Sequence, residues 1–227
     1  MRPTLSVALV AVVAPVVLAL VPAIPVAAGD STAAGGRAGH WRRAAQDAPS
    51  VEACKKRAEK EPNSAEAHND LGWALRQHGD LEGAERSLRE AIRLDARMPQ
   101  AHCNLSVVLL DKNDAQGAVQ EASEAAAIDP EQPIYRVVLG NALAASGDLK
   151  GAIEQYRAAI SRRPDYENAH YNLGRVLYES GDHTQAKFSL AEALRLDPND
   201  DRALSLLDKI TGAPASASPS ERKSPRK

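Results

Sequence analysis

Three histidines are the candidate metal ligands of this sequence, because of their residue type and their regular spacing. His68, His102 and His170 are separated by 34 or 68 residues, and imidazole is the commonest metal ligand in proteins. A metal site needs its donor atoms at about 2 Å from the ion. Side chains that recur at so long an interval do not converge on one point. We therefore expect these histidines to pack structurally, and we predict no metal ion or other cofactor.

Two further short patterns suggest ligand or modification sites. Residues 111–117 read D-K-N-D-A-Q-G, but the glycine falls one place late for a calcium loop and the closing glutamate is absent. Asn104-Leu105-Ser106 matches a glycosylation acceptor, although Leu105 has the spacing of a core residue. The sequence contains no H-E-x-x-H, C-x-x-C, P-loop, G-x-S-x-G or G-x-G-x-x-G motif. The chain is therefore predicted not to be an enzyme.

The elements that carry these residues repeat every 34 residues. Each unit has the pattern of two amphipathic helices: the first has two leucines four residues apart, and the second has two alanines seven residues apart. A small residue beside the first leucine allows a neighbouring helix to approach closely. The recurring positions are Leu71, Leu105, Leu139 and Leu173; Leu75, Leu109, Leu143 and Leu177; Ala84, Ala118, Ala152 and Ala186; and Ala91, Ala125, Ala159 and Ala193.

The helix boundaries are also marked in the sequence. Between the two helices of each unit, glycine or asparagine can adopt the left-handed conformation that ends a helix, and the following aspartate can cap the next helix. Prolines then end three of the second helices, and Ala96 stands where the first proline would be. These boundary residues are Gly79-Asp80, Asn113-Asp114, Gly147-Asp148, Gly181-Asp182, Pro130, Pro164 and Pro198.

These residues resemble the tetratricopeptide repeat family, whose signature is W-x2-L-G-x2-Y, then A-x3-F, A and P. The chain departs from it at the fourth place, where histidine or Arg136 replaces tryptophan, and at the eleventh, where leucine replaces tyrosine. The resemblance covers residues 65–200 and implies an all-α fold. The expected architecture is an α-solenoid of antiparallel helix pairs in a right-handed superhelix. The expected segments are a degenerate leading helix at 50–64, repeats at 65–98, 99–132, 133–166 and 167–200, and a capping helix at 201–212.

The two ends of the chain differ in composition from the repeats. Residues 1–28 combine one basic residue, an apolar run and a small-residue site at Val26-Ala27-Ala28, as in a secretory signal peptide. We expect cleavage after Ala28 and a periplasmic or secreted location; the alternative is an uncleaved membrane anchor. Residues 29–49 have the composition of a flexible linker, and residues 213–227 that of a disordered basic tail.

Charge and cysteine content limit the partners. The net charge is −2, and the basic tail leaves the repeat region mildly acidic, which argues against nucleic acid as a ligand. Export would permit a disulfide, but Cys54 and Cys103 lie about one and a half repeats apart, beyond disulfide reach. We expect two free, partly buried thiols.

The resemblance implies that the first helices line a concave groove for a protein or peptide partner. Asn104 and Asn172 resemble part of the asparagine ladder with which some family members hold a peptide backbone. Val137 and Val138 fall at groove places too, with packing between repeats as the alternative. The predicted binding residues are Asn69, Trp73, Arg76, Asn104, Leu110, Asn141, Tyr171, Asn172, Arg175 and Tyr178.

The predicted function is a non-catalytic scaffold or adaptor in an envelope or secreted assembly. The alternative is a structural spacer that associates with itself. A membrane would be a partner only if the N-terminal segment stays attached.

Overall fold

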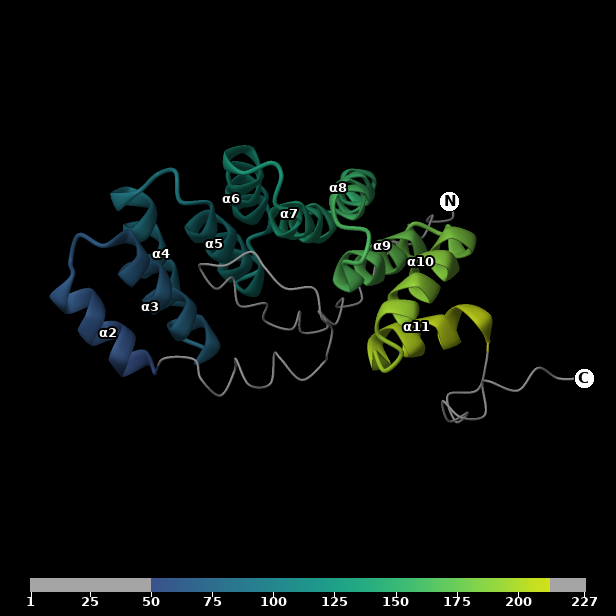
Figure 1. The fold of residues 1–227 in the computed structure, drawn as a ribbon, viewed down its shortest axis with the longest axis horizontal. Helices are drawn as coiled ribbons and strands as arrows, with labels where there is room; N and C mark the ends of the chain where they lie inside the picture. The colour runs from purple at the N-terminus through teal and green to yellow at the C-terminus, as the bar shows by residue number, and fades with distance from the viewer. Residues whose placement is uncertain (1–49, 213–227) are drawn as a thin grey trace, which may run out of the picture. The chain divides into compact units, whose positions relative to one another are not determined.

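The computed structural model describes residues 50–212, which lie within one unit spanning residues 32–227. These described residues form ten helices and no strand (Figure 1), so the all-α prediction is confirmed. None of the described helices is both long and apolar enough to cross a membrane. The expected signal peptide, linker and basic tail lie outside the described residues. The helices are α2 Val51–Lys60, α3 Ala65–Gln77, α4 Leu81–Leu94, α5 Pro99–Asp111, α6 Ala115–Ile128, α7 Pro133–Ala145, α8 Leu149–Arg162, α9 Glu167–Glu179, α10 His183–Leu196 and α11 Asp201–Thr211.

The helices form an α-solenoid in which α3, α5, α7 and α9 are the first helices of successive pairs. Each first helix packs against the second helix of its own pair, and each second helix packs against the next first helix. The backbones of successive first helices also approach one another, whereas those of no two second helices do so in the described region. The second helices α8 and α10 are joined only through side chains, by a hydrogen bond from Arg157 to Gln185. The first helices are therefore the more closely spaced layer. We call its outer surface the first-helix face.

The turn inside each pair has the predicted chemistry. Gly79, Gly147 and Gly181 have φ values of 83°, 91° and 88°, and Asn113 takes the same left-handed conformation with φ 61°. The aspartate that follows each of them caps the next helix, because a side-chain oxygen accepts a hydrogen bond from a free backbone N–H. The capping bonds join Asp80 to Gly83, Asp114 to Gly117, Asp148 to Gly151 and Asp182 to Gln185, at 2.8–3.0 Å.

The second helices end where the prolines predict. α6, α8 and α10 each end two residues before a proline. α4 ends at the equivalent residue, Leu94, although Ala96 takes the place of the proline. In α4 the N–H of Asp95 still bonds to the carbonyl of Ala91 at 2.8 Å, and Asp95 itself leaves the helical conformation. The proline therefore supports this boundary but is not required for it.

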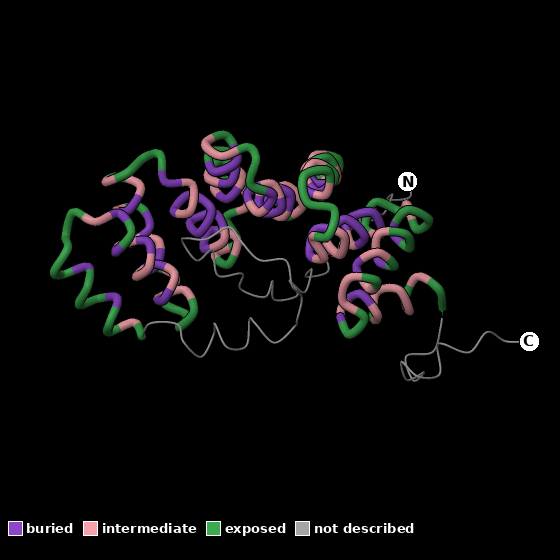
Figure 2. The backbone as a smooth tube through the Cα atoms, viewed as in Figure 1, coloured by how far each residue is buried: buried purple, intermediate pink, exposed green. Residues whose placement is uncertain are grey.

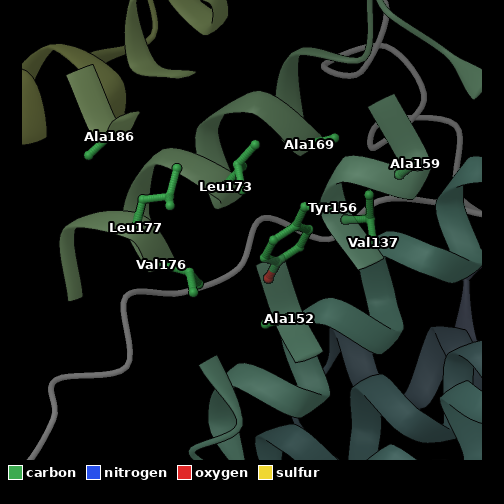
Figure 3. Packing of buried hydrophobic residues seen from close by; sticks show 9 residues of the cluster. All are labelled: Val137, Ala152, Tyr156, Ala159, Ala169, Leu173, Val176, Leu177 and Ala186. Atoms are coloured by element: carbon green, nitrogen blue, oxygen red, sulfur yellow. The ribbon is translucent and has the colours of Figure 1, made fainter. Parts of the chain in front are cut away.

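The core lies between the helices and consists mainly of alanine and leucine (Figure 2). Its largest fully buried side chain is Tyr156, which lies among Val137, Ala152 and Ala159 (Figure 3). The small residues of the first helices make room for this packing. A Cβ atom on Gly140 would approach Cε1 of Tyr156 to 2.7 Å, which is too close for unshifted atoms.

Both ends of the stack are covered by an additional helix. α2 packs on α3 and buries Cys54 and Ala58. α11 packs on α10 and α9, buries Ala203 and is capped by Gly212, which has the left-handed conformation. Cys54 and Cys103 are buried and are not joined by a disulfide. Burial raises the pKa of the Cys103 thiol to about 12, so this thiol stays protonated and unreactive at neutral pH.

Candidate partner-binding surface

The fourth residue of each repeat fastens its helix to the loop before it. His68, His102 and His170 each donate through Nε2 to the carbonyl oxygen of the residue six places earlier, at 3.1, 3.2 and 2.8 Å. Arg136 does the same through Nε at 3.3 Å. These side chains therefore have a structural role. The described residues contain no group of three or more histidine, cysteine, aspartate or glutamate side chains that could hold a metal ion.

Trp73 and Arg76 form a fixed unit at the N-terminal half of the first-helix face. Cζ of Arg76 lies 5.0 Å from the centre of the Trp73 ring, and its Nε donates to Oδ2 of Asp111 at 2.6 Å. Only 9% of the Arg76 side chain is exposed. Nε1 of Trp73 is buried and has no hydrogen-bond partner in the described part of the chain. Leu110, beside Asp111, is half-buried.

Two of the predicted binding residues, Asn69 and Asn104, bond to each other. Nδ2 of Asn104 donates to Oδ1 of Asn69 at 2.9 Å, and both residues are buried. Val137 and Val138 are buried as well, so packing between repeats, the alternative, is correct for them. Asn69 and Asn104 are covered because successive first helices touch, and Val137 packs in a cluster that includes α9 residues.

Asn141 satisfies a buried phenol group. Its Oδ1 accepts a hydrogen bond from the hydroxyl of Tyr156 at 2.7 Å. Tyr156 comes from the second helix of the same repeat and is fully buried, which raises the pKa of its hydroxyl well above the usual range. Without an acceptor, this hydroxyl would carry the cost of an unpaired buried polar group. Asn141 therefore has a structural task that its groove place alone did not reveal.

The C-terminal half of the first-helix face carries polar groups without internal partners. The amide of Asn172 and the hydroxyl of Tyr171 make no hydrogen bond within the described residues, and both side chains are half-buried. Arg175 pairs with Glu179 at 2.8 Å, and the ring of Tyr178 lies 5.2 Å from that of His183. Four of the predicted binding residues thus lie on α9, within three helical turns of each other.

Arg202 of the capping helix is a residue that sequence reasoning missed. Its guanidinium lies 4.5 Å from the centre of the Tyr171 ring and bonds to Glu167 at 3.2 Å and Asp200 at 2.9 Å. Burial and a hydrogen bond with Asp200 raise the pKa of Glu167 to about 7, while that of Asp200 is lowered by its bonds to Arg202 and Glu167 despite burial. Arg202 lies 34 residues after Asn168, at a groove place, and the repeat frame could have revealed it.

Family models agree with this geometry. Models described as tetratricopeptide repeats match residues 69–133 and 167–200, and one described as TPR repeat matches residues 140–181. The chain contains tetratricopeptide repeats. No curated protein matches the sequence.

Several solved structures, one of them described as a TPR protein, share the fold. Pseudomonas aeruginosa pilF is 24% identical, with a TM-score of 0.62 over 70% of this chain and 72% of that one. MamA from Desulfovibrio magneticus RS-1 is 23% identical, with a TM-score of 0.59 over 66% and 85%. YrrB, described as having an unusual peptide-binding site, is 21% identical, with a TM-score of 0.58 over 68% and 80%. At these identities the likeness establishes the fold.

Phe188 is the second residue that sequence reasoning missed. It lies on α10, the second helix of the fourth tetratricopeptide repeat, and its exposed fraction is 73%. Its position in the 34-residue repeat could have revealed it. The signature aromatic place of this repeat is held by Leu190, two residues later, so Phe188 falls on a different face of the helix.

Proposed function

We propose that the repeats bind an extended peptide or a helix of a protein partner on the first-helix face, without catalysing a reaction. The observation that carries this proposal is the half-buried aromatic side chains that the first helices α3 and α9 carry, with an amide on α9 that has no hydrogen-bond partner within the described residues. These residues are Trp73, Tyr171, Tyr178 and Asn172. Tetratricopeptide repeat proteins bind protein or peptide partners, and the peptide-binding site of YrrB supports this reading.

The chemistry of these residues suits a peptide. Tryptophan and tyrosine contribute much of the energy at protein interfaces because they bury a large area with few rotatable bonds. The Asn172 amide offers both a donor and an acceptor, which is what a peptide backbone requires. Arg76 and Arg202 lie over Trp73 and Tyr171 and hold these rings in place. Rings that are already ordered lose less entropy when a ligand binds.

The predicted residues then divide into two roles. Trp73, Tyr171, Asn172, Arg175 and Tyr178 contact the ligand. The others support them: Asn69 and Asn104 brace α3 against α5, Asn141 satisfies Tyr156, and Arg76 orients Trp73. Leu110 borders the Trp73 region as an apolar contact.

We further propose that the protein acts in an envelope or secreted assembly. The support is the N-terminal segment, whose basic start, apolar run and small-residue site are typical of a secretory signal. Cleavage would give a periplasmic or secreted protein, and retention would give one anchored in the membrane.

Binding can be tested with peptides selected from a random displayed library. The chain has two tryptophans, so the Trp41→Phe variant leaves Trp73 as the sole indole reporter. We expect a selected peptide to shift the emission of Trp73. Tyr171→Ala should weaken binding by about tenfold or more, the usual effect of losing an aromatic anchor.

The matched control is Arg86→Ala, which truncates an exposed side chain on the second helix α4. It should bind as the parent does. Helical circular dichroism must be unchanged in every variant. Peptides that bind Trp73→Ala and Tyr171→Ala as tightly as the parent chain would remove the first-helix face as the binding site.

A further inference from the structure

An exposed aromatic side chain stands on the surface opposite to the proposed groove. Phe188 is 73% exposed, and among the described residues no other large hydrophobic side chain is classed as exposed. In the other three repeats the same place is polar and exposed, with Arg86, Gln120 and Glu154. A solvent-facing place that is polar in three repeats and aromatic in the fourth points to a contact made only there.

Phe188 borders a hollow of about 390 Å³ between α8 and α10, which we call the α8–α10 furrow. The backbones of these two second helices do not approach each other, and a side-chain hydrogen bond from Arg157 to Gln185 at 2.7 Å joins them beside the furrow. Past this bond the lining reaches α9 at His170 and Leu173. Ile160 and Leu173 provide an apolar lining. Arg157 of α8 and Glu192 of α10 complete it with opposite charges.

The fourth repeat lacks a polar pair that the second and third repeats have between their first and second helices. In the second repeat, Nδ1 of His102 bonds to Glu121 at 2.7 Å, and this pair crosses from the first helix to the second. In the third repeat, Arg136 and Gln155 make the equivalent bond at 3.4 Å. In the fourth repeat the partner place holds Ser189. No hydrogen bond joins Ser189 to His170 within the described residues, and the first repeat has the same combination, Ser87 with His68. The polar pair between α8 and α10 is Arg157 with Gln185.

We propose that the occupant of the furrow is a second copy of this chain. The exposed ring of Phe188 lies next to the α8–α10 furrow, and the furrow is open to an aromatic ring from another molecule. Two copies related by a two-fold axis can each place Phe188 in the furrow of the other, as an isologous interface requires. This interface lies on second helices and is independent of the proposed peptide binding on the first-helix face.

The charges at the furrow support a copy of the same chain over a different partner. Arg157 and Glu192 are of opposite sign and form no ion pair with each other within the described residues; Arg157 bonds to Gln185, and Glu192 to Arg195. A two-fold axis through the patch brings Arg157 of each copy toward Glu192 of the other. The patch therefore carries both signs of charge, which a second copy in two-fold symmetry can pair. A contact made by one ring and one charge pair from each copy belongs to the weak class of interfaces, below about 1,200 Å² of buried surface.

Sedimentation velocity of the exported chain over a wide concentration range tests the proposal. We expect a monomer–dimer equilibrium in which Phe188→Ser weakens association by about tenfold or more, as loss of a central aromatic does. Glu154→Ser is the matched control, because Glu154 is exposed at the same place of the preceding repeat. It should associate as the parent does, and both variants should keep the helical circular dichroism.

A charge exchange tests the symmetry directly. Arg157→Glu and Glu192→Arg should each weaken self-association, because each places like charges opposite one another. A mixture of the two variants should recover dimers, since every contact between unlike copies then pairs opposite charges. A wild-type chain that stays monomeric at the highest concentration would overturn the proposal. So would dimers that persist unchanged in Phe188→Ser, or a mixture of the charge variants that stays monomeric.

Discussion

At the scale of single residues, the side chains at two facing positions of each repeat are matched in size. Where the first helix has glycine, the second helix presents a large side chain: Gly72 faces Leu88, Gly140 faces Tyr156 and Gly174 faces Leu190. The second repeat reverses the sizes, with Ser106 in the glycine place and Ala122 in the large place. The Ser106 hydroxyl donates to the carbonyl of Ala118 at 2.8 Å inside the core.

This matching predicts that the two places of the second repeat can be exchanged only together. Ala122→Leu alone should destabilise the fold by about 1–3 kcal/mol, because the larger side chain overpacks against Ser106. Ser106→Gly with Ala122→Leu recreates the pair found in the first repeat and should recover most of that loss. Urea unfolding of the parent, both single variants and the double variant gives the coupling energy.

Gly140→Ser is the companion variant in the third repeat. Its Cβ would meet the Tyr156 ring at 2.7 Å, so it should destabilise by a similar amount with no compensation available. Additive effects of Ser106→Gly and Ala122→Leu would show that the two places do not share one packing site.

At the scale of the elements, the helices could be predicted from the sequence because every local signal agrees. Leucine spacing, the left-handed glycine and the aspartate cap all mark the same boundaries, and the same agreement recurs in each repeat. Ala96 shows why agreement matters more than any one residue, since α4 ends in register without the proline. The hydrogen bonds from His68 and His170 to the preceding loop could not be predicted from the sequence. The periodicity of a helix does not show where the carbonyl groups of a neighbouring loop lie.

The site was predicted less well, and the reason lies in how the first helices pack. Helical periodicity separates one buried side from one exposed side, but a first helix has two covered sides. One faces its own second helix, and the other faces a neighbouring first helix. Asn104 bonds to Asn69 on the preceding first helix, Val137 packs with residues of α9, and both are buried. Tyr171 and Asn172 lie in the last repeat, beside the capping helix α11, and remain half-buried.

The junction of α9 with the capping helix should respond to pH. The pKa of Glu167 is about 7 in the folded protein, raised from 4.5 by burial and by its bond with Asp200. The folded state therefore binds this proton more tightly than the unfolded chain does. The free energy of unfolding should fall as pH rises from about 4.5 to about 7. Glu167→Gln, which keeps the shape of the side chain without its charge, should flatten this slope in urea unfolding.

The control for this prediction is Glu154→Gln, which changes an exposed carboxylate on α8. Its slope should match that of the parent. Hydrogen exchange assigns the effect to the junction: the amides of α11 should gain protection in Glu167→Gln at pH 8, where the parent carries the buried charge. Equal slopes for the parent and Glu167→Gln would show that Glu167 does not control the stability of this junction.

At the scale of the whole molecule, the described contacts run only between neighbouring helix pairs, as in other one-dimensional repeat arrays. The two proposed functions lie on different faces of this array. The first-helix face carries the half-buried aromatic and amide groups of the proposed peptide site, and the second helices carry Phe188 and the α8–α10 furrow. A dimer formed through the furrows would leave both first-helix faces open, so peptide binding and self-association can occur together.

The N-terminal segment, residues 1–28, gives a prediction about processing. We expect a protein recovered from an exporting bacterial host to begin at Gly29, because Val26-Ala27-Ala28 places small residues at the cleavage site. N-terminal sequencing and intact mass check this directly. Ala28→Arg should block cleavage, since a bulky charged side chain replaces the small residue that the site requires. The blocked form should stay with the membrane fraction, while the parent is released. A parent chain that keeps Arg2 and sediments with membranes would show that the segment is an anchor.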